Sequence, residues 1–250
     1  MPLNKELYYY LWIAPHILQI VLAVLMIRRR LVREFPVFFT YTIFEILQFF
    51  ILFALMHLHF KAYAVAYYGG ETVSSALRFA IIYEILSKVF GDYSPLSRIK
   101  HSLFHWATAV LMILAVLIVA YTPSMQTDSK VFVQNVLDRT ISITQCGLLL
   151  LLVGLSGFLK LSFRGFAFGI ALGLGIYDAI KLVDWGLVDR FGSLDTSDWF
   201  VMIVMAAYHC CVLFWVVTLV LARAQRVRAP EVSPSTLEQW DHTLERFLQS

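Results

Sequence analysis

Seven apolar stretches, each close to the length that crosses a bilayer, divide this chain of 250 residues, and the loops between them are alternately rich and poor in Lys and Arg. An α-helix rises ~1.5 Å per residue, so ~20 residues cross the ~30 Å hydrocarbon layer. The stretches predict spans at 8–27, 37–58, 66–90, 103–121, 134–159, 165–188 and 200–222. The predicted fold class is therefore an all-α integral membrane protein, a seven-transmembrane helix bundle.

The basic residues of the loops predict the orientation of this bundle. Twelve of the 20 basic residues lie in loops on one side, at Arg28, Arg29, Arg30, Arg33, Lys88, Arg98, Lys100, Lys160, Arg164, Arg223, Arg226 and Arg228. The loops on the other side carry only Lys5, Lys61, Lys130 and Arg190. Cytoplasmic loops are enriched in Lys and Arg. We therefore expect the N-terminus outside and the C-terminus in the cytoplasm, in the plasma membrane or the inner membrane.

The composition excludes several classes of protein. Hydrophobic residues make up 60% of the chain and charged residues 15%, whereas soluble domains have roughly 45–50% and 25%. A soluble domain is therefore excluded, and the lipid bilayer is the predicted environment. The net charge of +3 is small and concentrated beside the predicted cytoplasmic span ends, so it gives no support for a nucleic-acid partner.

Polar residues inside the spans predict where the interior of the bundle lies. A charged side chain near the membrane centre costs about 2.5–3.5 kcal/mol on the insertion scale, so such residues normally face other helices and have partners. The candidates for a ligand-binding site or polar core are Arg78, Asp178, Glu71, Glu45, Lys181, Asp184, Asp138, Gln145, His16 and His209.

The spacing of these residues places several of them on shared helix faces. Glu71, Ser74 and Arg78 recur at i, i+3 and i+7 on the third predicted span, which is one face of a helix. Counted from the span ends, Arg78 and Asp178 come to a similar depth in the membrane. We therefore predict that they pair across the third and sixth helices, with Glu45 as the competing partner of Arg78.

Most of the candidate residues lie from the middle of the membrane outward, and together they predict a polar cleft open to the extracytoplasmic side. Two interpretations remain open at this point. The polar groups form a binding pocket or ion path, or they only hydrogen-bond one another and fix the packing of the helices.

Glycines near the fifth and sixth spans predict close helix packing. The sixth span carries two overlapping small-xxx-small steps, at Gly165, Gly169 and Gly173, and Gly154 and Gly157 lie at the end of the fifth. Such steps let helix backbones approach closely. We expect this glycine-rich surface to pack the hairpin of the fifth and sixth spans, with a homodimer interface as the alternative.

The segment 223–250 is predicted to be a cytoplasmic basic linker followed by a short amphipathic helix. Ser235 and Glu238 have the spacing of a capping box, and an apolar face follows at Leu237, Trp240, Leu244 and Phe247. This helix is expected to lie on the inner membrane surface. The alternative is that it docks onto the bundle or onto a cytoplasmic or membrane protein partner.

No catalytic arrangement is found, so the chain is not expected to be an enzyme. The tetrapeptide at Gly154–Gly157 resembles the GxSG motif of rhomboid intramembrane proteases. However, Ser156 is predicted near the cytoplasmic end of its span, whereas His209 is near mid-span, and a nucleophile and its base must be within hydrogen-bond reach. Metal-binding spacings such as HExxH and CxxC are also absent from the sequence. We predict no catalytic residue, metal or cofactor.

The function that this pattern favours is a receptor-like or sensory membrane protein whose outer cleft binds a small polar ligand. One alternative is a small-solute or proton-coupled transporter, because Glu45 and Glu84 would extend a polar path toward the cytoplasm. A further alternative is a non-catalytic membrane scaffold or assembly partner without a ligand. The topology resembles seven-helix receptors in span count and orientation alone, which is an analogy of fold.

Overall fold

The computed structural model describes residues 5–56, 60–91, 94–121, 129–158, 166–191 and 197–221. Within these ranges the chain forms seven helices: α1 (Lys5–Arg28), α2 (Pro36–Met56), α3 (Phe60–Gly91), α4 (Ser94–Tyr121), α5 (Ser129–Phe158), α6 (Phe166–Phe191) and α7 (Ser197–Leu221). The predicted all-α class is confirmed for the described residues. The predicted tail helix, in 223–250, lies outside them.

Six of the seven helices are long and apolar enough to cross a membrane, so the chain is a multi-pass membrane protein. These are α1, α2, α4, α5, α6 and α7. The exception is α3, which has 32 residues but interrupts its apolar sequence with charged residues that include Glu71, Arg78 and Glu84.

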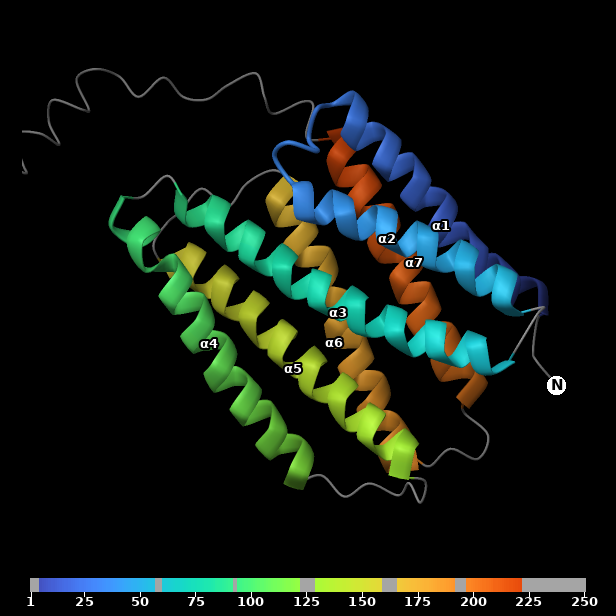
Figure 1. Ribbon diagram of the computed structural model, residues 1–250. Helices are drawn as coiled ribbons and strands as arrows, with labels where there is room; N and C mark the ends of the chain where they lie inside the picture. The colour runs from blue at the N-terminus through green and yellow to red at the C-terminus, as the bar shows by residue number, and fades with distance from the viewer. Residues whose placement is uncertain are drawn as a thin grey trace, which may run out of the picture.

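The contacts between the helices form a closed ring, with α3 drawn toward its interior. Each helix packs on the next along the chain, and α7 also packs on α1, which closes the ring. In addition, α3 contacts α5 and α6, whereas α4 packs only at the edge, against α3 and α5. Consecutive helices run in alternate directions (Figure 1). We call the end where α1, α3, α5 and α7 finish the basic end, because the Lys- and Arg-rich loops of the sequence follow there.

The apolar core lies in the half of the bundle near the basic end. Its fully buried members come from six helices and include Leu22, Met26, Phe38, Ile81, Ile85, Leu152, Ile170, Leu174 and Trp215. Lipid tails are as apolar as these side chains, so their contribution in a membrane comes mainly from close van der Waals packing. This half of the bundle is filled by side chains.

Aromatic rings join three helices within this core. The ring of Phe38 in α2 meets Trp215 of α7 edge-on at 5.0 Å between centroids and Phe166 of α6 at 5.7 Å. Tyr41, one turn further along α2, meets the same Trp215 at 6.3 Å. Edge-to-face pairs are the arrangement that the ring quadrupoles favour. These rings therefore hold α2, α6 and α7 in a defined register.

Glu84 of α3 binds the first turn of α2. The backbone N–H of Val37 donates to its Oε1 at 3.0 Å, and that of Phe38 donates to its Oε2 at 3.1 Å. The first N–H groups of a helix have no partner within the helix, and a carboxylate also interacts favourably with the positive end of the helix dipole. A buried carboxylate from another helix thus performs the task of an N-cap residue.

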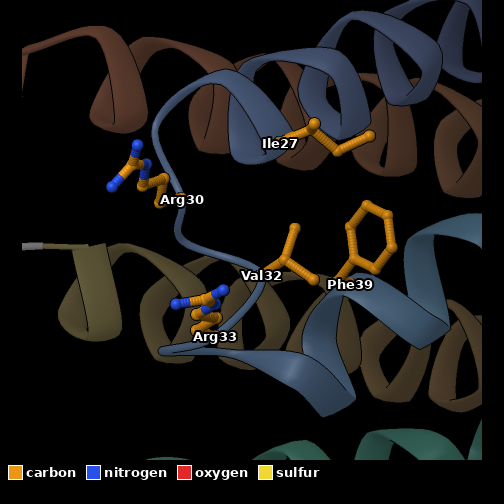
Figure 2. Close-up of a pocket in the computed structure, with 5 residues that line it drawn as sticks. All are labelled: Ile27, Arg30, Val32, Arg33 and Phe39. Carbon is orange, nitrogen blue, oxygen red and sulfur yellow. The ribbon is translucent and has the colours of Figure 1, made fainter.

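The turn between α1 and α2 forms a shallow groove at the basic end. Backbone hydrogen bonds close the turn, and Arg30 has a φ of 59°, in the left-handed region that L residues other than Asn and Asp seldom adopt. Figure 2 shows Arg30 and Arg33 at the turn, beside Ile27, Val32 and Phe39, around a groove of about 580 Å³. The neighbouring Arg29 donates from Nη1 to the carbonyl of Leu219 and thereby ties the turn to the last residues of α7.

The predicted packing partner of the glycine-rich helix is wrong. Gly169 and Gly173 of α6 face α7, where an added Cβ would overlap Thr218 and the indole of Trp215, respectively. An added Cβ on Gly154 of α5 would meet nothing within 4 Å. The reason is the ring order, which gives α6 a second neighbour that carries a bulky Trp at the level of Gly173. Gly165 lies outside the described residues, and so do the surroundings of Gly157.

Replacing Gly173 with Ala is expected to destabilise the protein by about 1–3 kcal/mol, because the buried indole of Trp215 has no room to move aside. The matched substitution Gly154→Ala adds the same methyl group at an open position and is expected to leave stability unchanged or slightly raised. Thermal unfolding in detergent, followed by circular dichroism, compares the two variants. Equal stability of the two variants would contradict the close contact between α6 and α7.

Candidate functional site

A polar cavity of about 490 Å³ occupies the half of the bundle away from the basic end. Side chains of α1, α2, α3, α5, α6 and α7 line it, and the polar ones are His16, Tyr41, Glu45, Gln48, Tyr67, Glu71, Ser74, Arg78, Asp138, Tyr177, Lys181 and Tyr208. Six of the residues predicted from the sequence are thus brought together around one space: His16, Glu45, Glu71, Arg78, Asp138 and Lys181.

Glu45 connects three helices at the wall of this cavity. Its Oε1 accepts a hydrogen bond from the Ser74 hydroxyl of α3 at 2.5 Å, and its Oε2 accepts one from the Tyr208 hydroxyl of α7 at 3.5 Å. Side chains that hydrogen-bond across helices contribute to helix association in membranes. The carboxylate of α2 therefore draws α3 and α7 together around itself.

The same network continues into α1. The amide of Gln19 donates to the Tyr208 hydroxyl at 2.5 Å, and its Oε1 lies 2.9 Å from Nδ1 of His16. The His16 ring stacks on Phe49 of α2, with centroids 4.2 Å apart. His16, Gln19, Tyr208 and Glu45 thus form one hydrogen-bonded chain across α1, α7 and α2, which ends at a carboxylate.

Arg78 lies at the cavity wall nearest the apolar core and is only 3% exposed. Its Nη2 donates to the Ser75 hydroxyl at 2.9 Å, and its guanidinium lies 5.8 Å from the centre of the Tyr177 ring, within cation–π range. The carboxylate that acts on it most strongly is that of Asp178, which is 1% exposed.

Arg78 and Asp178, which were predicted to pair, attract each other electrostatically, but Nε and Oδ1 form no hydrogen bond with each other. Nε of Arg78 and Oδ1 of Asp178 are both buried and have no hydrogen-bond partner among the described residues. Two opposite charges in a low-dielectric interior attract each other strongly even without contact. The two side chains therefore neutralise each other while keeping one donor and one acceptor atom free.

Lys181 and Asp138 form a second pair of opposite charges, further from the core. Lys181 is the charged group that acts most strongly on Asp138. Its Nζ lies 5.9 Å from the centre of the same Tyr177 ring that Arg78 approaches. Tyr177 therefore lies beside both cations of the cavity, and its ring attracts each of them.

Two further predicted residues, Gln145 and His209, lie outside the cavity lining. Gln145 of α5 is fully buried and donates to the backbone carbonyl of Ser75 at 3.0 Å, so it fixes α5 against α3. The His209 ring packs 5.6 Å from Tyr10 of α1. The side chain of Asp184, in α6, is outside the described part of the chain.

Sequence reasoning missed the role of Tyr177, which was not among the predicted site residues. Tyrosine occurs throughout this chain, both at helix ends and in the core, so residue type alone does not distinguish it. The available signal was its spacing, because Tyr177 precedes Lys181 by four residues and therefore shares its helix face.

Comparison of the chain with protein-family models, with curated proteins and with solved structures finds no match. The chemistry of the cavity must therefore be inferred from its own residues. Within the described ranges, no group of three His, Cys, Asp or Glu side chains could hold a metal ion. What these residues offer is recognition by charge, by hydrogen bonds and by aromatic rings.

Replacing Tyr208 with Phe removes only the hydroxyl that joins Gln19 to Glu45. We expect a loss of stability of about 0.6–1.7 kcal/mol, the range measured for hydrogen bonds between membrane helices. The control Tyr9→Phe removes a hydroxyl from an exposed ring and is expected to have no effect. Unfolding by denaturant in detergent measures both variants. If Tyr208→Phe leaves the stability unchanged, the hydrogen-bond network does not stabilise the bundle.

Proposed function

We propose that this chain is a receptor-like or sensory membrane protein that binds a small polar ligand in the cavity between α1, α2, α3, α5, α6 and α7. The observation that carries the proposal is the convergence of acidic, basic and aromatic side chains from six helices on one space of about 490 Å³. Ligand sites typically have volumes of roughly 300–1,000 Å³ and place a few polar groups among apolar ones. In this proposal the protein binds its ligand and catalyses no reaction.

The proposal takes α3 as the seventh span. Its polar residues Glu71, Ser74 and Arg78 line the cavity, so they need not face lipid. Its neighbours α2, α4, α5 and α6 cover it on several sides. A helix sheltered in this way tolerates charges that lower its hydropathy. With α3 across the membrane, the positive-inside rule puts the N-terminus outside and the basic end in the cytoplasm, in the plasma or inner membrane.

This orientation opens the cavity to the extracytoplasmic side and closes it toward the cytoplasm. Tyr41 lines the cavity and packs on Trp215, which belongs to the apolar core. Below this level, buried apolar side chains of the described residues pack together in one cluster. A ligand entering from outside would thus reach Tyr41 and Arg78 and stop there.

This closure favours binding over passage through the membrane. The transporter alternative uses Glu84 as the inner part of an ion path, but its two carboxylate oxygens accept hydrogen bonds from the backbone of α2. Its location at the first turn of α2 gives it a structural task. The aromatic contacts from Tyr41 through Trp215 to Phe38 and Phe166 offer a route by which a change at the cavity floor reaches the cytoplasmic side.

Access to the cavity from outside can be tested with single cysteines on α7. In a background with the three native cysteines changed to Ala, Met205→Cys puts a thiol at the cavity wall, and Ile203→Cys puts one on the exposed, lipid-facing surface. A membrane-impermeant maleimide added to right-side-out vesicles should label only Met205→Cys, because thiolates form in water and not in lipid. Labelling only from the inner face would reverse the orientation, and no labelling from either face would exclude an open cavity.

Ligand binding itself can be tested by the thermal stability of the purified protein in the presence of a set of small polar compounds. A compound that binds the folded state raises its unfolding temperature. We expect at least one such compound, and we expect the size of its effect to change in Lys181→Met, which alters the charge of the cavity. The control Lys88→Met removes an exposed lysine outside the cavity and should keep the effect. If every stabilising compound acts equally on both variants, the cavity has only a structural role.

A further inference from the structure

The charges around the cavity do not balance. Its lining contains the carboxylates of Glu45, Glu71 and Asp138 but only two permanent cations, Arg78 and Lys181. The buried Asp178, whose strongest charged neighbour is Arg78, adds a fourth carboxylate. With all of these groups ionised, carboxylates outnumber cations by two, in a part of the protein where unpaired charge is costly.

Both cations already have a carboxylate near them. Among carboxylates, Asp178 acts most strongly on Arg78, and Lys181 is the strongest charged neighbour of Asp138. Both cations also lie within 6 Å of the Tyr177 ring centre. An anionic ligand would have to compete with these partners for either cation.

The pairs Arg78–Asp178 and Lys181–Asp138 do not include the other two carboxylates of the cavity, Glu45 and Glu71. Glu45 accepts hydrogen bonds from the hydroxyls of Ser74 and Tyr208, and among charged groups the strongest influence on it is the repulsive one of Glu71. Arg78 also attracts both carboxylates, but neither forms an ion pair with a Lys or Arg within the described ranges. A cation placed between them would relieve this repulsion.

A buried acceptor atom without a partner belongs to a residue one turn from Glu45 on α2. Gln48 lies on the same face of α2, is 9% exposed and lines the cavity, and its Oε1 has no hydrogen-bond partner among the described residues. An ammonium group has N–H donors and no acceptor, so it satisfies carboxylate and amide oxygens together. A buried acceptor that remains without a donor costs about 1–3 kcal/mol.

Aromatic rings line the part of the cavity formed by α1 and α2. Trp12 packs edge-on against Phe49 at 5.2 Å between centroids, and His16 stacks on the same ring. Aromatic faces attract organic cations and also receive an apolar body. Carboxylates, a free acceptor and aromatic rings thus occur together at one wall, which would suit an ammonium group joined to an apolar part.

From these observations we infer that the ligand of the cavity is a small organic cation, an ammonium group on an apolar body, held by Glu45, Glu71 and Gln48 against the rings of Trp12 and Phe49. This inference rests on the proposed function, because it names the chemical class of the ligand for the same cavity. Its selectivity comes from the two carboxylates that the protein's own cations leave unpaired.

Three probes of equal shape and different charge test the inference on the purified full-length protein: 3-phenylpropylammonium, 3-phenylpropanoate and 3-phenylpropan-1-ol. The ammonium compound alone is expected to raise the unfolding temperature in a concentration-dependent way. Glu71→Gln, and likewise Glu45→Gln, should weaken its apparent affinity about tenfold or more, because each removes one charge of a buried attraction. The control Glu6→Gln removes an exposed carboxylate of α1 and should change nothing.

A second variant keeps the test valid if Glu45→Gln fails to fold. Gln48→Met preserves the length of the side chain and removes the free acceptor, so it should also weaken the binding of the ammonium probe. The inference is overturned if the carboxylate or the alcohol probe stabilises the protein as much as the ammonium probe, or if no probe stabilises it. In each of these cases the proposed function still stands if another compound stabilises the protein in a manner that depends on Lys181. Loss of that dependence as well would overturn both.

Discussion

Glu45 is a carboxylate inside a membrane protein, and the bundle is arranged so that it does not face lipid. Hydroxyl groups of α3 and α7 donate to it, and Gln19 and His16 extend the network into α1. Because a charged group facing hydrocarbon is costly, the helices that carry such groups must turn them toward one another. The same requirement explains the buried Arg78 and Asp178 and the location of the charged helix α3 among four neighbours.

The bundle separates two tasks along its length. The half near the basic end is packed with apolar side chains and aromatic rings, which fix the helices relative to one another. The other half leaves a space that six helices line with polar groups. Tyr41 and Arg78 stand at the boundary. A rigid base beneath a polar cavity holds its polar groups in place, so the proposed ligand would meet a largely formed site.

The helices could be predicted because each one is determined locally. A helix of ~20 apolar residues satisfies its own backbone hydrogen bonds, so the sequence segment alone is enough to predict a membrane-spanning helix there. The sequence also predicted part of the inward-facing helix surfaces. The spacing of Glu71, Ser74 and Arg78 places them on one helix face, and all three line one cavity. In contrast, the sequence did not predict which residues of different helices contact one another. The sequence pattern suggested α5 for Gly169 and Gly173, whereas they face α7, because α6 packs on both α5 and α7 and the glycine spacing does not specify which of these neighbours the glycines face.

The sequence by itself determined that the chain is a multi-pass helical membrane protein and which residues carry charge into the spans, because hydropathy and charge are properties of single residues and short segments. The tertiary structure alone decided what each charge does. Glu84 and Glu45 are both carboxylates inside the helical bundle, yet one caps α2 and the other lines the cavity. That difference arises from which backbone groups and side chains lie within hydrogen-bond reach once the helices pack, and no local pattern in the sequence encodes it.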